Sequence, residues 1–146
     1  MSFHKDILAW AKKSEARITA TYRRSIELLA DEMRRSVREG GNLPFLTGNL
    51  SRSLLASTSA MPSVGGPKEE YAGQDVNAIA VTLTPKQTVW IGYQAIYARR
   101  MNYGFVGSDS KGRVYNQQGL YFVEKAIAEW PAIVRRAANE IKSSVN

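Results

Sequence analysis

The sequence predicts an α+β domain in which a small antiparallel β-sheet packs against a long N-terminal helix and a C-terminal helix. Three patterns carry this prediction. Apolar residues recur at helical spacing across residues 1–39, two segments within 77–93 alternate and are rich in β-branched residues, and helical spacing returns from residue 120 onward. A chain of 146 residues has the length of one domain, and 44% hydrophobic residues suffice for a core. We therefore treat residues 1–146 as a single domain.

The N-terminal helix is predicted from an apolar stripe and from its ending. Gly40-Gly41 follows the stripe, as expected at a helix C-terminus, so the helix would occupy residues 1–39. Roughly 35 helical residues span about 50 Å, which is long for so small a domain. We therefore expect one end to project from the body and to pack on something else. The residues of the stripe are Ile7, Leu8, Ala11, Ile18, Tyr22, Ile26, Leu29, Met33 and Val37.

The middle of the chain is predicted to hold a turn, a long loop and a hairpin. The turn Thr47-Gly48-Asn49 should start a short helix that points Leu50 and Leu54 inward, with Thr47 or Asn49 as its cap. Residues 61–75 combine prolines, glycines and mixed charge without periodicity, which indicates a long loop. The segments 77–84 and 87–93 alternate, with Pro85-Lys86 between them, and predict a β-hairpin.

The C-terminal part is predicted to be mainly helical. Residues 96–105 would form one or two helical turns that end at Gly104, and residues 106–119 would form a second long loop with room for a short strand. The last helix contains Pro131, so it either kinks there or ends near Trp130 and restarts with Pro131 at its first position. Its apolar face consists of Phe122, Ala126, Ile133, Ala137 and Ile141.

The residue types that carry catalysis or bind metal are scarce. His4 is the single histidine and has no base or ligand partner nearby in the sequence, there is no cysteine, and no phosphate-binding loop is present. The thirteen acidic residues are scattered along the chain. We therefore expect no enzyme activity, catalytic residue, cofactor or metal. No apolar run approaches the ~20 residues of a membrane span, so no membrane partner is expected either.

Basic residues outnumber acidic ones, and the net charge of +7 favours a nucleic acid or an acidic protein as partner. Lys12-Lys13, Arg23-Arg24 and Arg34-Arg35 recur about three helical turns apart and would form a line on the polar side of the long helix. This line is either an ordinary solvated face or a contact with DNA or an acidic neighbour. The tyrosines around Arg99-Arg100 suit stacking on bases and a protein interface equally.

Three blocks of the sequence resemble the signature blocks of the phage head–tail joining family, the neck or tail-completion proteins of long-tailed double-stranded-DNA phages and prophages. The blocks are "LTGNLSRSLLASTSAMPS" (46–63), "VWIGYQAIYARRMNYGF" (89–105) and "QQGLYFVEKAIAEWPAIVRRAANEI" (117–141). Within them, the family pattern matches the Thr-Gly-x-Leu turn at Thr47 and the Gly-Tyr pair at Gly92. The order and the spacing of the three blocks make the match more specific than any one block.

The resemblance implies a virion structural protein at the head–tail interface, assembled in the bacterial host cytoplasm. It would form a homo-oligomeric ring of about six or about twelve subunits around the DNA channel. Its partners would be the head connector or stopper and the tail terminator or tail-tube protein, with weak, non-specific contact to the genomic DNA. A tail terminator of related fold and a non-specific DNA-binding module are the alternatives, and a hydrolase with a carboxylate site is a distant third.

Polar and aromatic residues of the first two blocks are the candidates for subunit or partner contacts. Gly48 is expected to serve a structural corner whose polar neighbours face a partner and not a phosphate. For the aromatic residues, burial in the core of the same chain is the competing interpretation. The candidate contact residues are Thr47, Asn49, Arg52, Tyr97, Arg99, Arg100, Tyr103 and Phe105.

Overall fold

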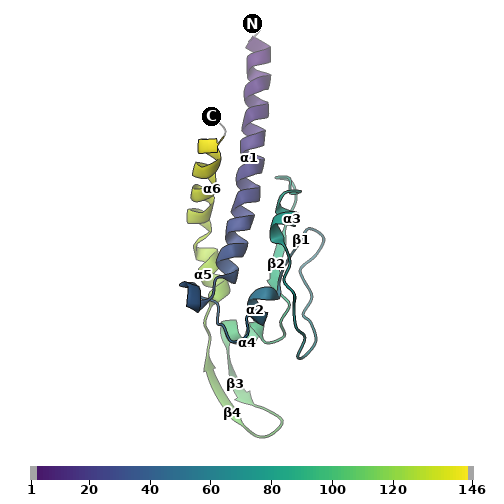
Figure 1. Cartoon of the computed structure of the whole chain (residues 1–146), viewed down its shortest axis with the longest axis vertical. Coiled ribbons are helices and arrows are strands. Elements are labelled where there is room, and N and C mark those ends of the chain that lie inside the picture. The colour runs from purple at the N-terminus through teal and green to yellow at the C-terminus, as the bar shows by residue number, and fades with distance from the viewer. Residues whose placement is uncertain (1–2, 145–146) are drawn as a thin grey trace.

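The computed structural model describes residues 3–144 and shows an elongated molecule (Figure 1). Helix α1 forms the long axis, and α6 runs antiparallel beside it, so both chain ends lie toward the same end of the molecule. The pair β1–β2 and the short helix α3 lie on the other side of α1, and the β3–β4 hairpin projects from the opposite end. The helices and strands are α1 (Phe3–Arg34), the 3₁₀ helix η1 (Val37–Glu39), α2 (Asn49–Arg52), β1 (Leu54–Ser57), α3 (Val76–Ala80), β2 (Trp90–Tyr93), α4 (Ala98–Tyr103), β3 (Gly104–Ser108), β4 (Val114–Gln118), α5 (Phe122–Ala128) and α6 (Trp130–Ser144).

The long helix is confirmed, but the prediction that it continues to residue 39 was wrong. It ends at Arg34 because the extended backbone of Ser36 starts the separate helix η1, and the Glu39 carboxylate accepts a 3.1 Å hydrogen bond from the Ser36 N–H. The chain then folds back, and the Val37 N–H donates to the Leu43 carbonyl at 2.9 Å. As a result Val37 is 56% exposed, and Leu43, absent from the predicted stripe, is buried.

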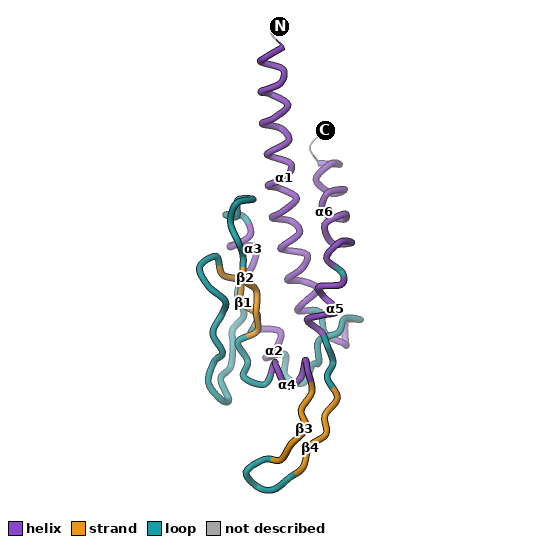
Figure 2. The backbone as a smooth tube through the Cα atoms, turned by 180° about the vertical axis from the view of Figure 1, so that it is seen from behind, coloured by secondary structure: helices purple, strands orange, loops and turns teal. Residues whose placement is uncertain are grey.

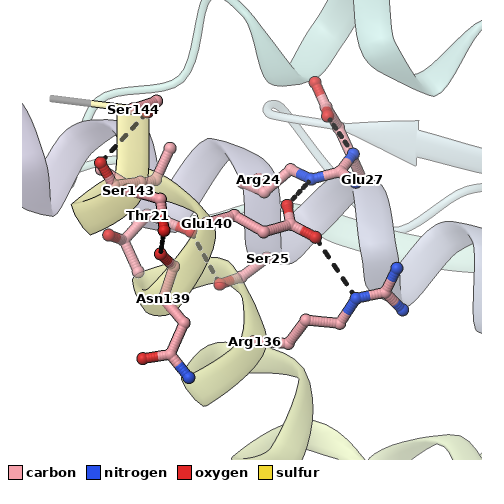
Figure 3. Close-up of polar contacts among 10 residues, drawn as sticks. Thr21, Arg24, Ser25, Glu27, Arg136, Asn139, Glu140, Ser143 and Ser144 are labelled. Carbon is pink, nitrogen blue, oxygen red and sulfur yellow. Dashed lines mark hydrogen bonds and ion pairs between the residues drawn. The ribbon is translucent and has the colours of Figure 1, made fainter.

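The predicted stripe of α1 is buried only along its C-terminal half. Ile26 and Met33 belong to the core, whereas Ile18 is 58% exposed. The remainder of the helix projects beyond the body, as its length predicted (Figure 1). An ion pair of 2.6 Å between Arg24 and Glu140 fixes α6 beside the middle of α1 (Figure 3).

The predicted hairpin across residues 77–93 was wrong in its first half. Residues 87–93 contain β2 as expected, but β2 pairs antiparallel with β1, placing Leu54 opposite Tyr93. Residues 76–80 are helical because the Asp75 carboxylate accepts a 3.1 Å hydrogen bond from the Asn77 N–H and so caps α3. The residues that this segment buries, Val76, Ala80 and Leu83, also fit helical spacing.

A third correction concerns residues 106–119, which were predicted to be a loop with room for one short strand. They contain most of an antiparallel hairpin, in which Gly104 pairs with Gln118 and Ser108 with Val114. Within residues 3–144 the strands therefore form two separate two-stranded sheets and not one. Figure 2 shows the β3–β4 hairpin standing away from the helices. The loop predicted at residues 61–75 is confirmed, because it contains neither helix nor strand.

The C-terminal segment follows the restart alternative, shifted by one residue. Helix α5 ends at Ala128 and α6 begins at Trp130, so Pro131 occupies the second helical position, where its missing N–H costs no hydrogen bond. Four of the five predicted apolar residues are buried, and Ile141 is half-buried.

The core lies where the C-terminal half of α1 meets the other elements. Its main cluster joins Ile26 and Met33 of α1 to Leu54 of β1 and to Leu83. A second cluster joins the segment around α2 to α4 and α5, and a third fastens α6 to α1. The buried residues of the second cluster are Leu43, Leu50, Ala95, Ala98 and Phe122.

Candidate partner-binding surface

The turn at residues 47–52 is a rigid corner closed by its own arginine. Gly48 has a left-handed backbone with φ of 82°, and an added Cβ would lie 2.8 Å from Nη1 of Arg52. Nη1 of Arg52 donates to the Thr47 carbonyl at 3.1 Å, and its Nε donates to the Tyr71 carbonyl at 2.8 Å. The Thr47 hydroxyl accepts from the Asn49 N–H at 3.3 Å. Gly48 therefore has the structural role predicted for it.

The same corner holds the loop of residues 61–75 in place. The Asn49 side chain donates to the Glu69 carbonyl at 3.0 Å and accepts from the Tyr71 N–H at 2.8 Å. The Tyr71 hydroxyl donates to the Gln94 carbonyl at 3.1 Å, directly after β2. The polar groups of Asn49 are thus used within the chain, while Thr47 and Arg52 are exposed, and contact of these residues with a partner stays a prediction.

The other predicted contacts lie on α4 and at the start of β3. The guanidinium of Arg100 stacks on the ring of Phe105, with 4.2 Å from Cζ to the centroid. The Phe105 ring in turn contacts that of Tyr115, at 6.1 Å between centroids, so a cation and two aromatic rings form a row along the hairpin. Tyr97 is 40% exposed, and Arg99 is also exposed. None of these five side chains is buried in the core.

Tyr103 and Glu124 form the polar base of this surface. Tyr103 is 56% exposed, and its ring meets that of Tyr121 edge-on at 6.4 Å. A hydrogen bond to Glu124 raises the pKa of Tyr103. Glu124 is held from the other side by Asn102, whose Nδ2 donates to Oε2 at 2.9 Å, and this bond lowers the pKa of the Glu124 carboxyl.

Asn102 is a residue that sequence reasoning missed. It is buried, and its Oδ1 accepts a 3.0 Å hydrogen bond from the Val123 N–H in the first turn of α5. Its carbonyl accepts from the Tyr121 N–H at 2.9 Å. Tyr121 itself has a left-handed backbone with φ of 51°, which is uncommon for a residue with a side chain. Asn102 therefore fixes the angle between α4 and α5.

The candidate contact residues thus fall into two groups that share one foundation. The corner and α4 rest on the same buried cluster, which contains Leu50 from α2, Ala98 from α4 and Phe122 from α5. The predicted residues are therefore brought to one end of the molecule, beside the base of the hairpin (Figure 1).

The line of basic residues predicted along α1 is mostly engaged within the chain. Arg23 donates to the Leu83 carbonyl at 2.8 Å, and Arg24 pairs with both Glu27 and Glu140 (Figure 3). Arg34 donates to the Gln74 carbonyl at 2.8 Å, and its burial lowers its pKa. These contacts favour the interpretation of an ordinary helix face over that of a continuous DNA-binding line.

The described residues contain neither a cluster of metal-binding side chains nor a helix that could span a membrane. Among residues 3–144, no group of three or more His, Cys, Asp or Glu side chains is placed to hold a metal ion. No helix in this part of the chain is long and apolar enough to cross a membrane. The larger of the two surface hollows that stand out, of about 440 Å³, is lined by Asp31, Arg34, Arg35, Glu39 and Ser51.

Comparison of the chain with family models, curated proteins and solved structures finds no match.

Proposed function

We propose that this chain is a structural protein of a phage neck, which joins the head connector to the tail tube as a ring around the DNA channel. The observation that carries the proposal is the assembly of the three sequence blocks into one unit. The first and second blocks pair as β1 and β2, and the second and third are joined where Asn102 holds Glu124. All three supply residues to one buried cluster. Blocks that resemble family signatures here behave as parts of a single fold.

The shape of the subunit also supports the proposal. A ring subunit needs two different patches, because closed rings form through head-to-tail contacts. This molecule offers the projecting half of α1 at one end and the row of Arg100, Phe105 and Tyr115 at the other. Arginine and aromatic residues are enriched at protein interfaces. We place the subunit or partner contacts on α4 and the hairpin, with the corner at residues 47–52 beside them.

A cryo-electron-microscopy reconstruction of the particle neck is the direct test. We expect a ring of about six or about twelve copies of this chain between the portal side and the tail tube. A neck with a single copy, or with none, would overturn the proposal. Particles are needed because neck proteins of this kind often assemble only on their neighbours, so a monomeric purified chain does not decide the question.

A salt series of duplex-DNA binding separates the neck protein from a DNA-binding module. Genome passage needs a wall that holds DNA weakly, so we expect little affinity at physiological salt. A protein that makes six to ten phosphate contacts loses ~10³–10⁵ in affinity between 50 and 200 mM salt. Micromolar or tighter binding that persists at physiological salt would favour the DNA-binding module, and the neck proposal would then fail.

A further inference from the structure

The free half of α1 carries an uncovered apolar face, which we call the N-terminal stripe. Phe3 is 79% exposed, Trp10 is 70% exposed and Ile7 is 47% exposed, although all three are large apolar residues. Exposed apolar patches of this kind mark interaction sites. On a helix with 3.6 residues per turn the members share one face. The N-terminal stripe consists of Phe3, Ile7, Trp10, Ala11, Ser14 and Ile18.

This stripe continues the face that α6 covers farther along α1. Ala11, Ile18 and Ser25 follow one another at seven-residue spacing on this face. Ser25 and Leu28, at the far end of the series, are buried. Leu28 forms one cluster with Ile133 and Ala137 of α6. In Figure 1, α6 ends well short of the start of α1. The same helix face is therefore packed in its second half and bare in its first.

Charges beside the stripe indicate what covers it. Asp6 and Lys13 lie on one side of it, seven residues apart. None of the ion pairs within residues 3–144 involves these two side chains. In two antiparallel helices each side faces the same side of its partner in reverse order. Asp6 then meets Lys13 of the second copy, and by the two-fold symmetry Lys13 meets Asp6.

We propose that the N-terminal stripe binds the N-terminal stripe of a second copy of this chain, as an antiparallel two-fold pair. In this register Phe3 of one copy faces the small Ser14 of the other, and Ile7 faces Trp10. Each contact occurs twice, because a two-fold interface uses the same patch on both subunits.

The arrangement of α6 excludes the parallel alternative. A second α1 lying parallel on the stripe would run, in its lower half, into the space that α6 already occupies. An antiparallel partner helix overlaps only the N-terminal stripe, and the rest of the partner subunit lies beyond the Phe3 end of α1. The pair has no polarity, whereas a neck ring has a head side and a tail side. It is therefore a form of the free protein, and it stands or falls independently of the neck proposal.

Charge exchange on the purified protein tests the pair. Sedimentation equilibrium should show a monomer–dimer equilibrium in the micromolar range. Asp6→Lys and Lys13→Asp should each raise the dissociation constant about tenfold, because two like-charge contacts replace two ion pairs. The double variant should return to within about threefold of wild type. Lys12→Asp, on the far side of the helix, is the control and should change little.

Cysteine cross-linking tests the antiparallel direction of the pair. The chain has no native cysteine, so the introduced cysteines are the only ones that can react. A mixture of Phe3→Cys and Ser14→Cys proteins should form a disulfide between the two variants on oxidation, while neither variant alone should cross-link. Circular dichroism should be unchanged, since residues 3–18 contribute no buried residue to the core. Three results would overturn the proposal: monomers at every concentration, no rescue by the double variant, or cross-links within a single variant.

Discussion

The hydroxyl of Tyr93 donates a 2.7 Å hydrogen bond to the carbonyl of Met33, near the C-terminal end of α1. This carbonyl is among the last four of the helix, which have no partner within the helix itself. The Tyr93 ring also meets the Phe122 ring edge-on at 5.3 Å. One side chain thus joins β2 to α1 and to α5, at the centre of the fold.

Removing the Tyr93 hydroxyl should destabilise the protein without changing its fold. Tyr93→Phe leaves the Met33 carbonyl without its partner, and the free energy of unfolding should fall by about 1–2 kcal/mol. Urea denaturation followed by circular dichroism measures this loss. Tyr97→Phe, at an exposed position on the same segment, is the matched control and should cost less than about 0.5 kcal/mol. Equal losses in the two variants would contradict the assigned role of the bond.

Stability should decline at alkaline pH, and Tyr93 should contribute to the decline. Burial raises the pKa of Tyr93 far above its usual 10.0. The folded state therefore keeps the phenol proton in a range where the unfolded chain has lost it, so this contribution is complete below pH about 10 and is lost as the pH rises further. Urea midpoints of wild type should fall from pH 9 to pH 11, and those of Tyr93→Phe should fall less. Identical slopes would refute this.

The sequence predicted features that repeat along the chain. The long helix α1, the inward face of α5 and α6, and the end of α4 at Gly104 all follow from spacing or from a helix-ending glycine. Contacts that depend on one residue or on a distant partner were not predicted. A single capping carboxylate at Asp75 turned a predicted strand into α3. The strand β4 reads Val-Tyr-Asn-Gln-Gln, which lacks an alternating apolar pattern because neither of its faces is buried.

Only part of the candidate surface was predicted, because some of its contacts also depend on single residues or on distant partners. Arg100 and Phe105 were selected from their residue types, and the structure stacks them on each other. Asn102 was missed because a lone asparagine has no periodic signal, and its importance comes from burial beside Glu124. The internal bonds of Arg52 were equally unpredictable, since Tyr71 lies nineteen residues away across a loop.

Asn102 should be essential for the junction between α4 and α5. Asn102→Ala removes the bonds to Glu124 and to the Val123 N–H, and it should lower the free energy of unfolding by about 2–3 kcal/mol. Asn139→Ala, at an exposed position on α6, is the matched control, with an expected loss below about 0.5 kcal/mol. Thermal and urea unfolding of both variants would show the difference. If Asn102→Ala were as stable as the control, the junction would not depend on this amide.

Two glycines with the same backbone handedness should respond differently to substitution. Gly104 has φ of 86°, and an added Cβ would lie 2.5 Å from the Gln117 carbonyl oxygen, whereas Gly112 has φ of 78° and open space around it. Gly112→Ala should therefore cost about 1 kcal/mol, from backbone strain alone. Gly104→Ala should cost at least about 2 kcal/mol more, because the strand pair must also separate. Similar urea midpoints for the two variants would show that the approach at Gly104 relaxes freely.

The proposed neck function predicts that charge reversal on α4 abolishes head–tail joining while leaving the subunit folded. Arg99→Glu and Arg100→Glu together change the exposed surface and remove the cation from the Phe105 ring. Complementation of a phage lacking this protein should yield separate heads and tails, and the infectious titre should drop by at least about a hundredfold. Arg135→Glu with Lys142→Glu, an exposed pair on α6, matches the change in charge and should preserve the titre. Normal yield from the α4 variant would remove α4 from the interface.

The β3–β4 hairpin is not packed against the core, and this determines how it moves. All five residues of β4 are exposed, and Val106 and Val114 contact no core cluster among the described residues. A two-stranded ribbon without a packed face is marginally stable. The backbone bonds of its outer part, away from the base at Gly104, therefore open and close as a local unit, at a small fraction of the free energy needed to unfold α1. A partner that binds the ribbon must order it, and the loss of conformational entropy lowers the binding affinity. Such a contact therefore gains selectivity more readily than affinity.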